Sequence, residues 1–537
     1  MRRAGLIAAA MVAGWYLLTL AIAGPLVNAP VVDGWLYVAC VRWLVRTGEL
    51  RLAGFQSAMP VLQMYYGAAW GMLFGLSHGS LEISVALLGA STAVLFHALA
   101  LRCGAHPRNA LLATGLLICN PCYLFLSFSF MTEIPFLALM IGALLAFARA
   151  GDGRETAWLW TSAALVVAGF LVRPFAGAVA AGCIAAVLLY DFDPAGAQDL
   201  KRIAKRVAPY AIAVSACAII WLWLTVLKPL PWDFQRRVGR FALLFRVPIG
   251  TYVLGGVLGP ALNLGALLSP LAVLQWRRDR MARMLGVAAA IFALTAYLVR
   301  IYPDAVEPEF SCFGGWANVL QLRGLPLRYF WKDGGRLLAV GLGSVGAVGL
   351  SMAARDVIAS LNRAAAAVFI TAALYWLAMV PLWFFNDRYD IVLLPAGCLL
   401  LALAPHPRGR LASAAAVAML AVLGWVAIAG VYDYQRGITA VVAARDALLK
   451  SGVPRAKIDA GYALNGEDLY RYPKRGIDTM AFEAGIPLIT TLDLSEYTVA
   501  AAPIAGTTII ARYQWPGPLG MGHRDVYVLK REHANGR

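Results

Sequence analysis

Long apolar blocks, joined mostly by short polar turns and in a few places by longer loops, make up the first 431 residues of the chain. Each block approaches the roughly 20 residues that an α-helix needs to cross about 30 Å of hydrocarbon. The blocks therefore predict transmembrane helices. We place thirteen spans, at residues 6–26, 81–101, 110–128, 134–150, 157–172, 174–190, 208–227, 250–275, 284–301, 336–353, 364–384, 390–404 and 411–431.

Residues 432–537 have a different pattern and contain no further apolar block. A helical pattern runs from about Tyr434 to Leu449 and is stopped by Gly452 and Pro454. Short strand-like runs follow at residues 457–463, 497–501, 507–512 and 525–529. The sequence therefore predicts an α-helical polytopic membrane domain, residues 1–431, and a small α/β domain outside the membrane, residues 432–537.

The N-terminal run has two interpretations. Arg2 and Arg3 precede apolar residues that end at Ala21-Ile22-Ala23, which is the pattern of a cleavable signal peptide. The apolar run is long for such a peptide, so we favour an uncleaved first span.

Composition excludes several classes of protein. Hydrophobic residues make up 61% of the chain and charged residues 14%, and the mean hydropathy is +0.69. These values, together with the long apolar blocks, exclude a soluble enzyme and a disordered, collagen-like or coiled-coil chain. The net charge of +17 does not indicate nucleic acid, because no arginine-rich run has interleaved aromatic residues. Basic residues in loops set topology and contact anionic membrane lipids instead.

Loop charge predicts the orientation of the spans. With the N-terminus in the cytoplasm, the inner loops are short and densely basic, as the positive-inside rule requires. An odd number of spans then places the C-terminus outside, together with the long loops 27–80, 228–249 and 302–335. The composition, rich in Ala and Gly, suggests a GC-rich bacterial genome, and the expected location is a bacterial inner membrane. Cys40 and Cys312 fall in outer loops, and the sequence leaves open whether they pair.

Two carboxylates stand at the outer membrane face. Asp33 follows the first span and is flanked by Trp35 and Tyr37. It is either a solvated loop acid or a general base held at the interface. Glu133 lies in an almost loop-free turn between two spans, next to Pro135. A helix N-terminus accounts for part of this pattern, but a charge so near the hydrocarbon is expensive unless it is hydrated, paired or used.

Two arginines occupy similar turns. Arg173 precedes Pro174, and Arg388 lies between Asp387 and Asp390. Arg388 either forms a local ion pair or, like Arg173, binds an anion, because a guanidinium group suits phosphate oxygens. A further basic cluster either holds phosphate or belongs to a solvated loop, which is the interpretation we favour for any single member; its members are Arg323, Arg328, Lys332 and Arg336.

The sequence motifs of several other enzyme classes are absent. The chain contains no zinc-protease pattern, no nucleophile elbow and no phosphate-binding loop of ATPases, and its cysteines have no metal-ligand spacing. Two carboxylates and two arginines on one membrane face suit transfer from a lipid-linked phosphate. A base removes the acceptor's proton, and cations stabilise the departing phosphate.

An ordered series of motifs resembles the GT-C class of membrane glycosyltransferases. Within that class the chain is most similar to the branch containing the protein O-mannosyltransferases and the lipid A aminoarabinose transferase. The motifs, in chain order, are Asp33-Gly34-Trp35-Leu36-Tyr37, Thr47-Gly48-Glu49-Leu50, Pro60 to Tyr66, Leu73-Phe74-Gly75, Asn120-Pro121, Thr132-Glu133-Ile134-Pro135, Arg173-Pro174, Asp387-Arg388-Tyr389 with Pro395, and, in the tail, Ile458 to Tyr462 with Asn465-Gly466. One departure is clear, because many members carry a second acid where this chain has Gly34.

The resemblance implies an inverting glycosyltransferase that uses a polyprenyl-phosphate sugar on the outer face of the membrane. It makes Asp33 the catalytic base and Glu133 a second catalytic carboxylate that orients hydroxyl groups. Arg173 and Arg388 hold the donor phosphate. Tyr37, Tyr65 and Tyr66 are the expected substrate-binding residues. The scheme requires no metal and no cofactor beyond the lipid-linked donor, and the acceptor is a lipid, a polysaccharide or a protein.

Two other functions stay open at this stage. A transporter or flippase for a lipid-linked or anionic substrate would use the same arginines along a pathway, although charged residues are scarce within the spans. A membrane scaffold would use the tail as a binding module. Convergence of the four charged residues at the outer face favours the transferase, whereas a site at the midplane favours transport.

Overall fold

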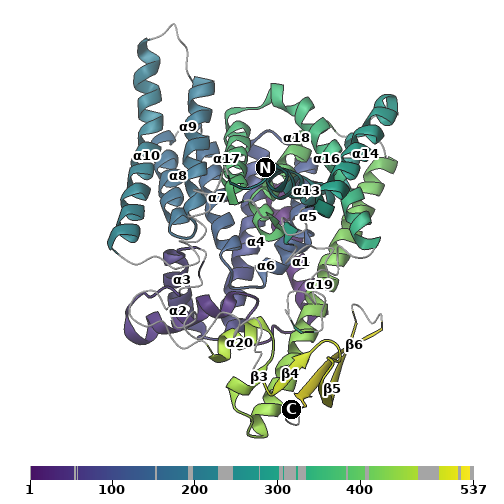
Figure 1. Ribbon diagram of the computed structural model, residues 1–537. Helices are drawn as coiled ribbons and strands as arrows, with labels where there is room; N and C mark the ends of the chain where they lie inside the picture. The colour runs from purple at the N-terminus through teal and green to yellow at the C-terminus, as the bar shows by residue number, and fades with distance from the viewer. Residues whose placement is uncertain are drawn as a thin grey trace.

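The computed structural model is a bundle of long helices with a small β-sheet at one end (Figure 1). It describes residues 2–53, 56, 58–151, 154–191, 197–227, 246–276, 278–301, 306–307, 322–323, 334–382, 385–405, 410–469, 495–517 and 522–532. A helix or helix pair lies at every position where the sequence predicts a span. These helices are α1 (Arg2–Ala23), α4 (His78–Arg102), α5 (Pro107–Ile118), α6 (Pro121–Ser127), α7 (Glu133–Arg149), α8 (Glu155–Phe170), α9 (Gly177–Asp191), α10 (Ala197–Leu222), α12 (Ile249–Thr251), α13 (Gly259–Ala272), α14 (Met281–Ile301), α16 (Gly334–Val357), α17 (Arg363–Met379), α18 (Leu394–Leu403) and α19 (Arg410–Lys450).

Helix length divides the predicted spans into two groups. Within the described ranges, eight helices are long and apolar enough to cross a membrane, or nine if the bent pair α5–α6 is one span. That pair bends by 64°, because the Asn120 side chain caps α6 and Pro121 begins it. The remaining predicted spans are the shorter helices α7, α8, α17 and α18, which have 17, 16, 17 and 10 residues. The polytopic α-helical fold is thereby confirmed.

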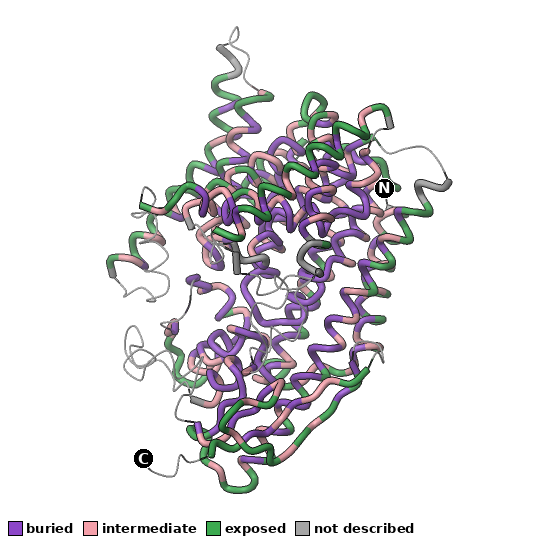
Figure 2. The backbone as a smooth tube through the Cα atoms, turned by 45° about the vertical axis from the view of Figure 1, so that its right-hand side comes forward, coloured by how far each residue is buried: buried purple, intermediate pink, exposed green. Residues whose placement is uncertain are grey.

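The helices differ in how deeply they are buried (Figure 2). More than half of the span in α4 is buried, 56%, whereas the spans in α1 and α10 are 28% buried and that in α14 is 22% buried. Exposed apolar side chains on α14 include Leu285 and Tyr297. Such exposure suits hydrocarbon, where every backbone polar group is already paired inside the helix. Helix α4 is therefore central, and α1, α10 and α14 present apolar faces to lipid.

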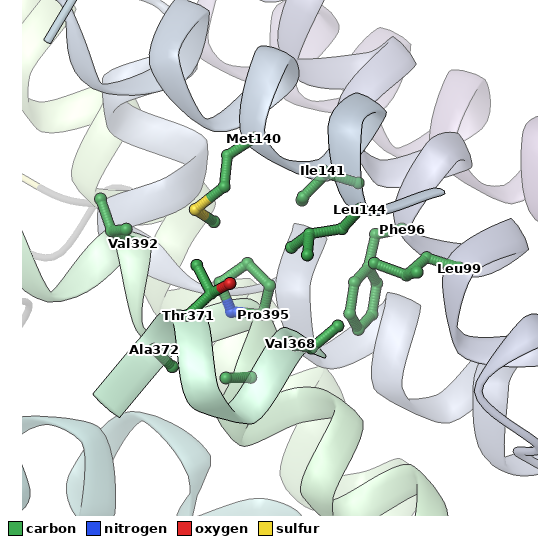
Figure 3. Close-up of a pocket in the computed structure, with 11 residues that line it drawn as sticks. Phe96, Leu99, Met140, Ile141, Leu144, Val368, Thr371, Ala372, Val392 and Pro395 are labelled. Carbon is green, nitrogen blue, oxygen red and sulfur yellow. The ribbon is translucent and has the colours of Figure 1, made fainter. Parts of the chain in front are cut away.

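A small hollow lies deep in the bundle, between α4, α7, α17 and the region around α18 (Figure 3). Its volume is about 10 Å³, room for at most one water molecule. Its lining is apolar apart from Thr371, whose buried Oγ1 has no hydrogen-bond partner among the described residues. This hollow is a packing defect and is far too small for a substrate.

The predicted first outer loop, residues 27–80, contains two helices, α2 (Gly34–Thr47) and α3 (Val61–Phe74). They lie at the same end of the bundle as the β-sheet and helix α20 (Tyr462–Leu469) (Figure 1). Cys40 is buried in α2, and its Sγ accepts a hydrogen bond from Gln56. Cys312 lies outside the described residues, as do most of the predicted loops 228–249 and 302–335.

The C-terminal sheet has four strands in the order β3-β4-β6-β5. These are β3 (Ile458–Asp459), β4 (Tyr497–Ala500), β5 (Thr507–Pro516) and β6 (His523–Arg531). Strand β3 pairs parallel with β4, and the other pairs are antiparallel, with Val499 opposite Val528. Each predicted strand overlaps an observed one, which confirms the small α/β region, but β3 is shorter than predicted, because the predicted run 457–463 ends inside α20.

Helix α19 joins the two parts of the chain. It runs unbroken for 41 residues, or roughly 60 Å at 1.5 Å per residue. The sequence predicts two elements here, a span ending at 431 and a helix beginning at Tyr434. The structure has a single helix because Tyr432 and Asp433 include no proline or glycine to end it.

Candidate active site

Asp33 lies directly before α2, where the chain leaves α1. It occupies the N-cap position, but its side chain makes no capping hydrogen bond. The preceding residue, Val32, has a φ of 45° and is the only non-glycine residue with positive φ in the described part of the chain. A β-branched residue in this region stores strain of about 1–3 kcal/mol. The strained turn leaves the Asp33 carboxylate available to residues from distant parts of the chain.

Glu133 and Arg173 meet between α7 and α8. Glu133 is the first residue of α7, where the helix N-terminus favours a negative charge. Arg173 has extended backbone, with φ −146°, as expected before Pro174. Its Nη2 donates to Glu133 Oε1 at 2.5 Å, and its Nε donates to Thr132 Oγ1 at 2.8 Å. The guanidinium group is therefore held on two sides by the start of α7.

Arg388 connects this pair to Asp33. It lies in the turn Asp387–Val392, between α17 and α18. Its Nη1 donates to Asp33 Oδ2 at 2.9 Å, and its Nε lies 3.7 Å from Glu133 Oε1. The structure thus brings Asp33, Glu133, Arg173 and Arg388 into one cluster, which we call the four-charge cluster. The individual roles expected of these residues remain predictions.

The members of the four-charge cluster differ in solvent access. The side chain of Glu133 is fully buried, and those of Arg388 and Arg173 are 6% and 9% exposed. Asp33 is 20% exposed. The second oxygen of Glu133, Oε2, is buried without a hydrogen-bond partner among the residues described, and a buried acceptor of this kind calls for an explanation. Asp33 is therefore the more accessible of the two carboxylates.

The four-charge cluster lies where helices begin or end. Asp33 directly precedes α2, and Glu133 is the first residue of α7. Arg173 follows α8, and Arg388 precedes α18. Asp33 also contacts α20, so the cluster lies at the end of the bundle that carries α2, α3 and the sheet (Figure 1). It does not lie partway along the long helices.

Tyrosine rings surround the four-charge cluster. The Tyr389 ring lies 5.7 Å from the Arg173 guanidinium carbon and 5.5 Å from that of Arg388. Tyr37 is buried in α2. Burial raises the pKa of Tyr37 above its ordinary value, and the negative charges of Asp33 and Glu133 raise it further. Tyr37 therefore stays protonated beside the cluster, where it can serve as a hydrogen-bond donor.

Helix α3 approaches the four-charge cluster through Gln63. Its Nε2 donates to the carbonyl oxygens of Phe130 and Met131, at 3.4 and 3.3 Å, just before Glu133. Of the predicted substrate-binding residues on this helix, Tyr66 donates its hydroxyl hydrogen to Ser84 in α4, and Tyr65 is half exposed. Among the described residues, charge interactions therefore link Tyr37 to the cluster, and the described contacts of Tyr66 lead to α4 instead.

The C-terminal region supplies a residue that sequence reasoning missed. Tyr462, the first residue of α20, donates its hydroxyl hydrogen to Asp33 Oδ1 at 2.8 Å. Tyr462 belongs to a tail motif noted in the sequence, but 429 positions separate the two residues. No local pattern predicts a contact over such a separation.

A second polar group supports the Arg388 turn. Asn263 of α13 donates to Asp390 Oδ2 at 2.8 Å, and both side chains are buried. The Tyr375 hydroxyl of α17 donates to the carbonyl oxygen of Tyr389 at 3.1 Å. Asp390 thus anchors the turn to α13, and this anchoring role was missed in the sequence.

The additional basic cluster predicted around the end of the loop 302–335 is described only in part. Arg323 pairs with Asp459 of β3 at 2.7 Å. Arg328 and Lys332 lie outside the described residues, and the side chain of Arg336 is not described. Arg323 therefore joins this loop to the C-terminal sheet.

The two hollows described in the structure lie apart from the four-charge cluster. A hollow of about 650 Å³ lies between α1, α3 and the start of α4, lined mainly by apolar residues such as Leu26, Trp70 and Phe74. None of the cluster residues lines this hollow or the small one in Figure 3. Among the described residues, no group of three or more His, Cys, Asp or Glu side chains is placed to hold a metal ion.

Comparison with known proteins gives distant matches only. No protein-family model and no curated protein matches the sequence. Among solved structures, ArnT from Cupriavidus metallidurans bound to undecaprenyl phosphate is 15% identical over 99% of each chain, with a TM-score of 0.43. The archaeal oligosaccharyltransferase AglB from Archaeoglobus fulgidus is 14% identical over 90% of this chain and 63% of its own, with a TM-score of 0.44.

The protein O-mannosyltransferase complex Pmt1-Pmt2 of S. cerevisiae is 16% identical over 39% of this chain, with a TM-score of 0.32. This chain spans about a third, 32%, of that protein's length. A protein O-mannosyltransferase is one of the two kinds of enzyme that the sequence motifs resemble. All three scores are low, so the function of this chain is inferred from the four-charge cluster itself.

Proposed function

We propose that the protein is an inverting glycosyltransferase. It takes a sugar from a polyprenyl-phosphate donor and transfers it to an acceptor at the outer face of a bacterial inner membrane. In this proposal the N-terminus is cytoplasmic, and the C-terminal domain lies outside the cytoplasm. The sequence motifs suggest this chemistry, and the four-charge cluster supplies groups suited to it.

The main evidence for this proposal is the difference in solvent exposure between the side chains of the four-charge cluster. A general base must reach the proton that it removes. Asp33 is 20% exposed, whereas Glu133 is fully buried. Arg388 donates to one oxygen of Asp33 and so holds that oxygen within the cluster. Asp33 is therefore our choice for the base.

The reaction then proceeds in one displacement. The acceptor hydroxyl oxygen attacks the anomeric carbon of the sugar while its proton passes to Asp33. The bond between that carbon and the phosphate oxygen breaks on the opposite face, and polyprenyl phosphate leaves with the bonding electron pair. Arg173 and Arg388 stabilise the negative charge on the departing phosphate.

The two oxygens of the Glu133 carboxylate have different roles in this proposal. Its Oε1 accepts from Arg173 and lies near Arg388, so it holds the two guanidinium groups together. Its Oε2 is buried without a described partner. We assign this oxygen to a hydroxyl group of the bound sugar, which would enter the cluster beside Asp33 and donate a hydrogen bond to Oε2.

The position of the four-charge cluster favours a transferase over a transporter. A transport pathway needs polar groups near the bilayer midplane. The four charged residues instead lie at helix ends, beside α2 and α20. The acceptor stays open, because a lipid, a polysaccharide or a protein hydroxyl fits this chemistry equally well.

The test compares cells with and without the gene by mass spectrometry of envelope lipids and glycans. We expect one sugar modification to disappear on deletion and to return with the wild-type gene. Asp33→Asn should restore less than about 1% of it, since general-base catalysis contributes roughly 10²–10⁴-fold. The purified Asp33→Asn protein should still bind undecaprenyl phosphate, because the arginines remain. Glu49→Gln, a solvated acid with 64% exposure in the same outer segment, is the matched control.

Two results would overturn the proposal. Restoration by Asp33→Asn at the wild-type level removes Asp33 as the base. An unchanged glycan and lipid profile on deletion, with altered transport of a lipid-linked precursor, points to the flippase instead.

A further inference from the structure

We propose that Tyr462 of the C-terminal domain is a positioning residue that completes the site by orienting Asp33. The inference rests on the proposed function, because it assigns a task to a residue that acts through the catalytic base. It also gives the C-terminal domain a direct part in the reaction.

Both oxygens of the Asp33 carboxylate have a donor. Tyr462 donates to Oδ1 at 2.8 Å, and Arg388 donates to Oδ2 at 2.9 Å. Two donors on different oxygens fix the rotation of the carboxylate plane, which a single donor does not. A carboxylate has about four lone-pair positions, so each oxygen retains capacity to accept the substrate proton. Orientation matters because small misplacements of reacting groups cost large factors in rate.

Close packing sets the position of the Tyr462 hydroxyl. The rings of Trp35 and Tyr462 meet edge to face, with centroids 6.1 Å apart. One turn further along α20, a Cβ added at Gly466 would fall 2.2–2.6 Å from the Trp35 ring atoms. Glycine at 466 therefore allows α20 to lie directly on Trp35, which is fully buried two residues after Asp33. This contact holds the helix at the distance that the hydroxyl bond requires.

Tyr462 is also fixed to the C-terminal sheet. Asp459 in β3 accepts from the backbone nitrogen of Gly461 at 3.2 Å and from Asn465 Nδ2 at 2.8 Å. Asn465 in turn accepts from the backbone nitrogen of Ala460 at 2.8 Å. Gly461 itself has a φ of +86°, which favours glycine. The turn before Tyr462 is thus held rigidly, and the sheet sets the position of its hydroxyl.

An ion-pair contact joins the far end of α20 to the membrane domain. Glu467 lies 2.6 Å from Arg42 of α2 and 3.2 Å from His78 of α4. Helix α20 is therefore attached at both ends, through Asp33 at its start and through Arg42 and His78 at its end. The hydroxyl of Tyr462 reaches Asp33 only while the C-terminal domain is docked in this way.

The test uses Tyr462→Phe in the full-length protein. We expect about 10-fold less of the sugar modification that depends on the gene, because the loss of a hydrogen bond to a charged group has an effect of this order. The dissociation constant of the purified variant for undecaprenyl phosphate should stay within 2-fold of wild type. Protease protection of the C-terminal domain should also be unchanged, which separates positioning from a structural role.

Two further variants sharpen the result. Tyr527→Phe is the matched control, since Tyr527 also donates its hydroxyl to an aspartate, Asp525, within the same sheet, and it should keep wild-type activity. Gly466→Ala displaces α20 from Trp35 and should lower activity at least as much as Tyr462→Phe. The double variant Tyr462→Phe with Gly466→Ala should then be no less active than Gly466→Ala alone.

The failures of the two proposals are distinguishable. If Asp33→Asn is inactive but Tyr462→Phe has wild-type activity, the positioning role is wrong and the glycosyltransferase proposal stands. If Tyr462→Phe loses lipid binding or protease protection in proportion to its activity, Tyr462 has a structural role only, and the inference is overturned. If Asp33→Asn keeps wild-type activity, the proposed function fails first.

Discussion

Burial of four charges at one site is tolerable because their signs balance. Removing a carboxylate or guanidinium group from water costs several kcal/mol unless a partner compensates. Glu133, fully buried, has Arg173 at 2.5 Å, and Asp33 has Arg388 at 2.9 Å. Lysine would not replace either arginine conservatively, because it lacks the planar set of donors. Away from the site, the negative charge of Glu467 is likewise compensated, by Arg42 and His78.

Glu467 connects α20 to α2 and α4 through its charge. Burial alone would raise its pKa, but hydrogen bonds and charges from His78 and Arg42 outweigh burial and lower the pKa of Glu467 to about 2. In the unfolded chain a glutamate titrates near pH 4.3. The folded state therefore gains stability from Glu467 above about pH 4.3, and this gain is lost as the pH falls toward 2.

Glu467→Gln should remove this pH-dependent contribution. At pH 5 we expect the variant to be less stable by roughly 3 kcal/mol, the value that the lowered pKa implies. The difference in melting temperature between wild type and variant, measured on detergent-purified protein, should narrow as the pH falls from 5 to 2. A difference that stays constant over this range would contradict the assignment. Glu49→Gln, in an exposed pair with Arg51, is the control and should show no such trend.

At the scale of elements, α13 and α16 cross at unusually close range. A Cβ added at Gly346 of α16 would fall 1.9 Å from the carbonyl oxygen of Gly265 in α13. A Cβ at Gly343 would meet the Leu262 carbonyl oxygen at 2.6 Å, and one at Gly349 would meet that of Ala272 at 2.2 Å. Small residues at intervals of three thus bring the two backbones together, as is typical of helix pairs in membranes.

Gly346→Ala should destabilise the protein, because the added methyl group has no room beside the α13 backbone. We expect a cost of about 1–3 kcal/mol, seen as a lower temperature at which the detergent-purified protein loses its monodisperse elution profile. Gly341→Ala on the same helix is the matched control, since a Cβ there has nothing within 4 Å. That variant should be unchanged or slightly more stable, as alanine favours a helix over glycine. Equal behaviour of the two variants would rule out the close crossing.

At the scale of the whole molecule, α19 makes the C-terminal sheet continuous with the membrane bundle. Asp433, 2% exposed within this helix, accepts from Trp515 Nε1 of β5 at 3.2 Å. It also lies 3.2 Å from Arg524 Nε of β6. A single carboxylate on the helix therefore attaches both of the longer strands, and the position of the sheet relative to the bundle depends on it.

Asp433→Ala should loosen the sheet without removing the helices. The buried Trp515 donor would lose its acceptor, at a cost of about 1–3 kcal/mol. We expect cleavage in the C-terminal domain by trypsin to become at least 5-fold faster in the purified protein. Asp446→Ala is the matched control, because Asp446 lies on the same helix with 44% of its side chain exposed. Cleavage of Asp433→Ala at the wild-type rate would show that other contacts hold the sheet.

The sequence by itself determined the order of the helices, the short strands of the tail and the chemical types of the candidate site. Apolar runs are local, and hydrocarbon admits only segments whose backbone groups pair internally, so hydropathy alone locates them. The turns at Glu133 and Arg173 could likewise be found locally, since a charge so close to apolar spans stands out. The residues to either side of Asp433 show the limit of this reasoning, because the sequence predicted two helices where α19 is one.

Only the tertiary structure decided how these residues meet. Asp33 and Arg388 are 355 positions apart, and Asp33 and Tyr462 are 429 apart. Which side chains touch across such separations depends on helix packing and on close contacts such as that of Gly466 with Trp35, and these leave no local pattern. For the same reason the sequence did not indicate that Tyr462 donates to Asp33 or that Gln63 donates to the carbonyl oxygens of Phe130 and Met131. Local pattern thus identified the charged groups, and packing alone assembled them into one site with the C-terminal domain.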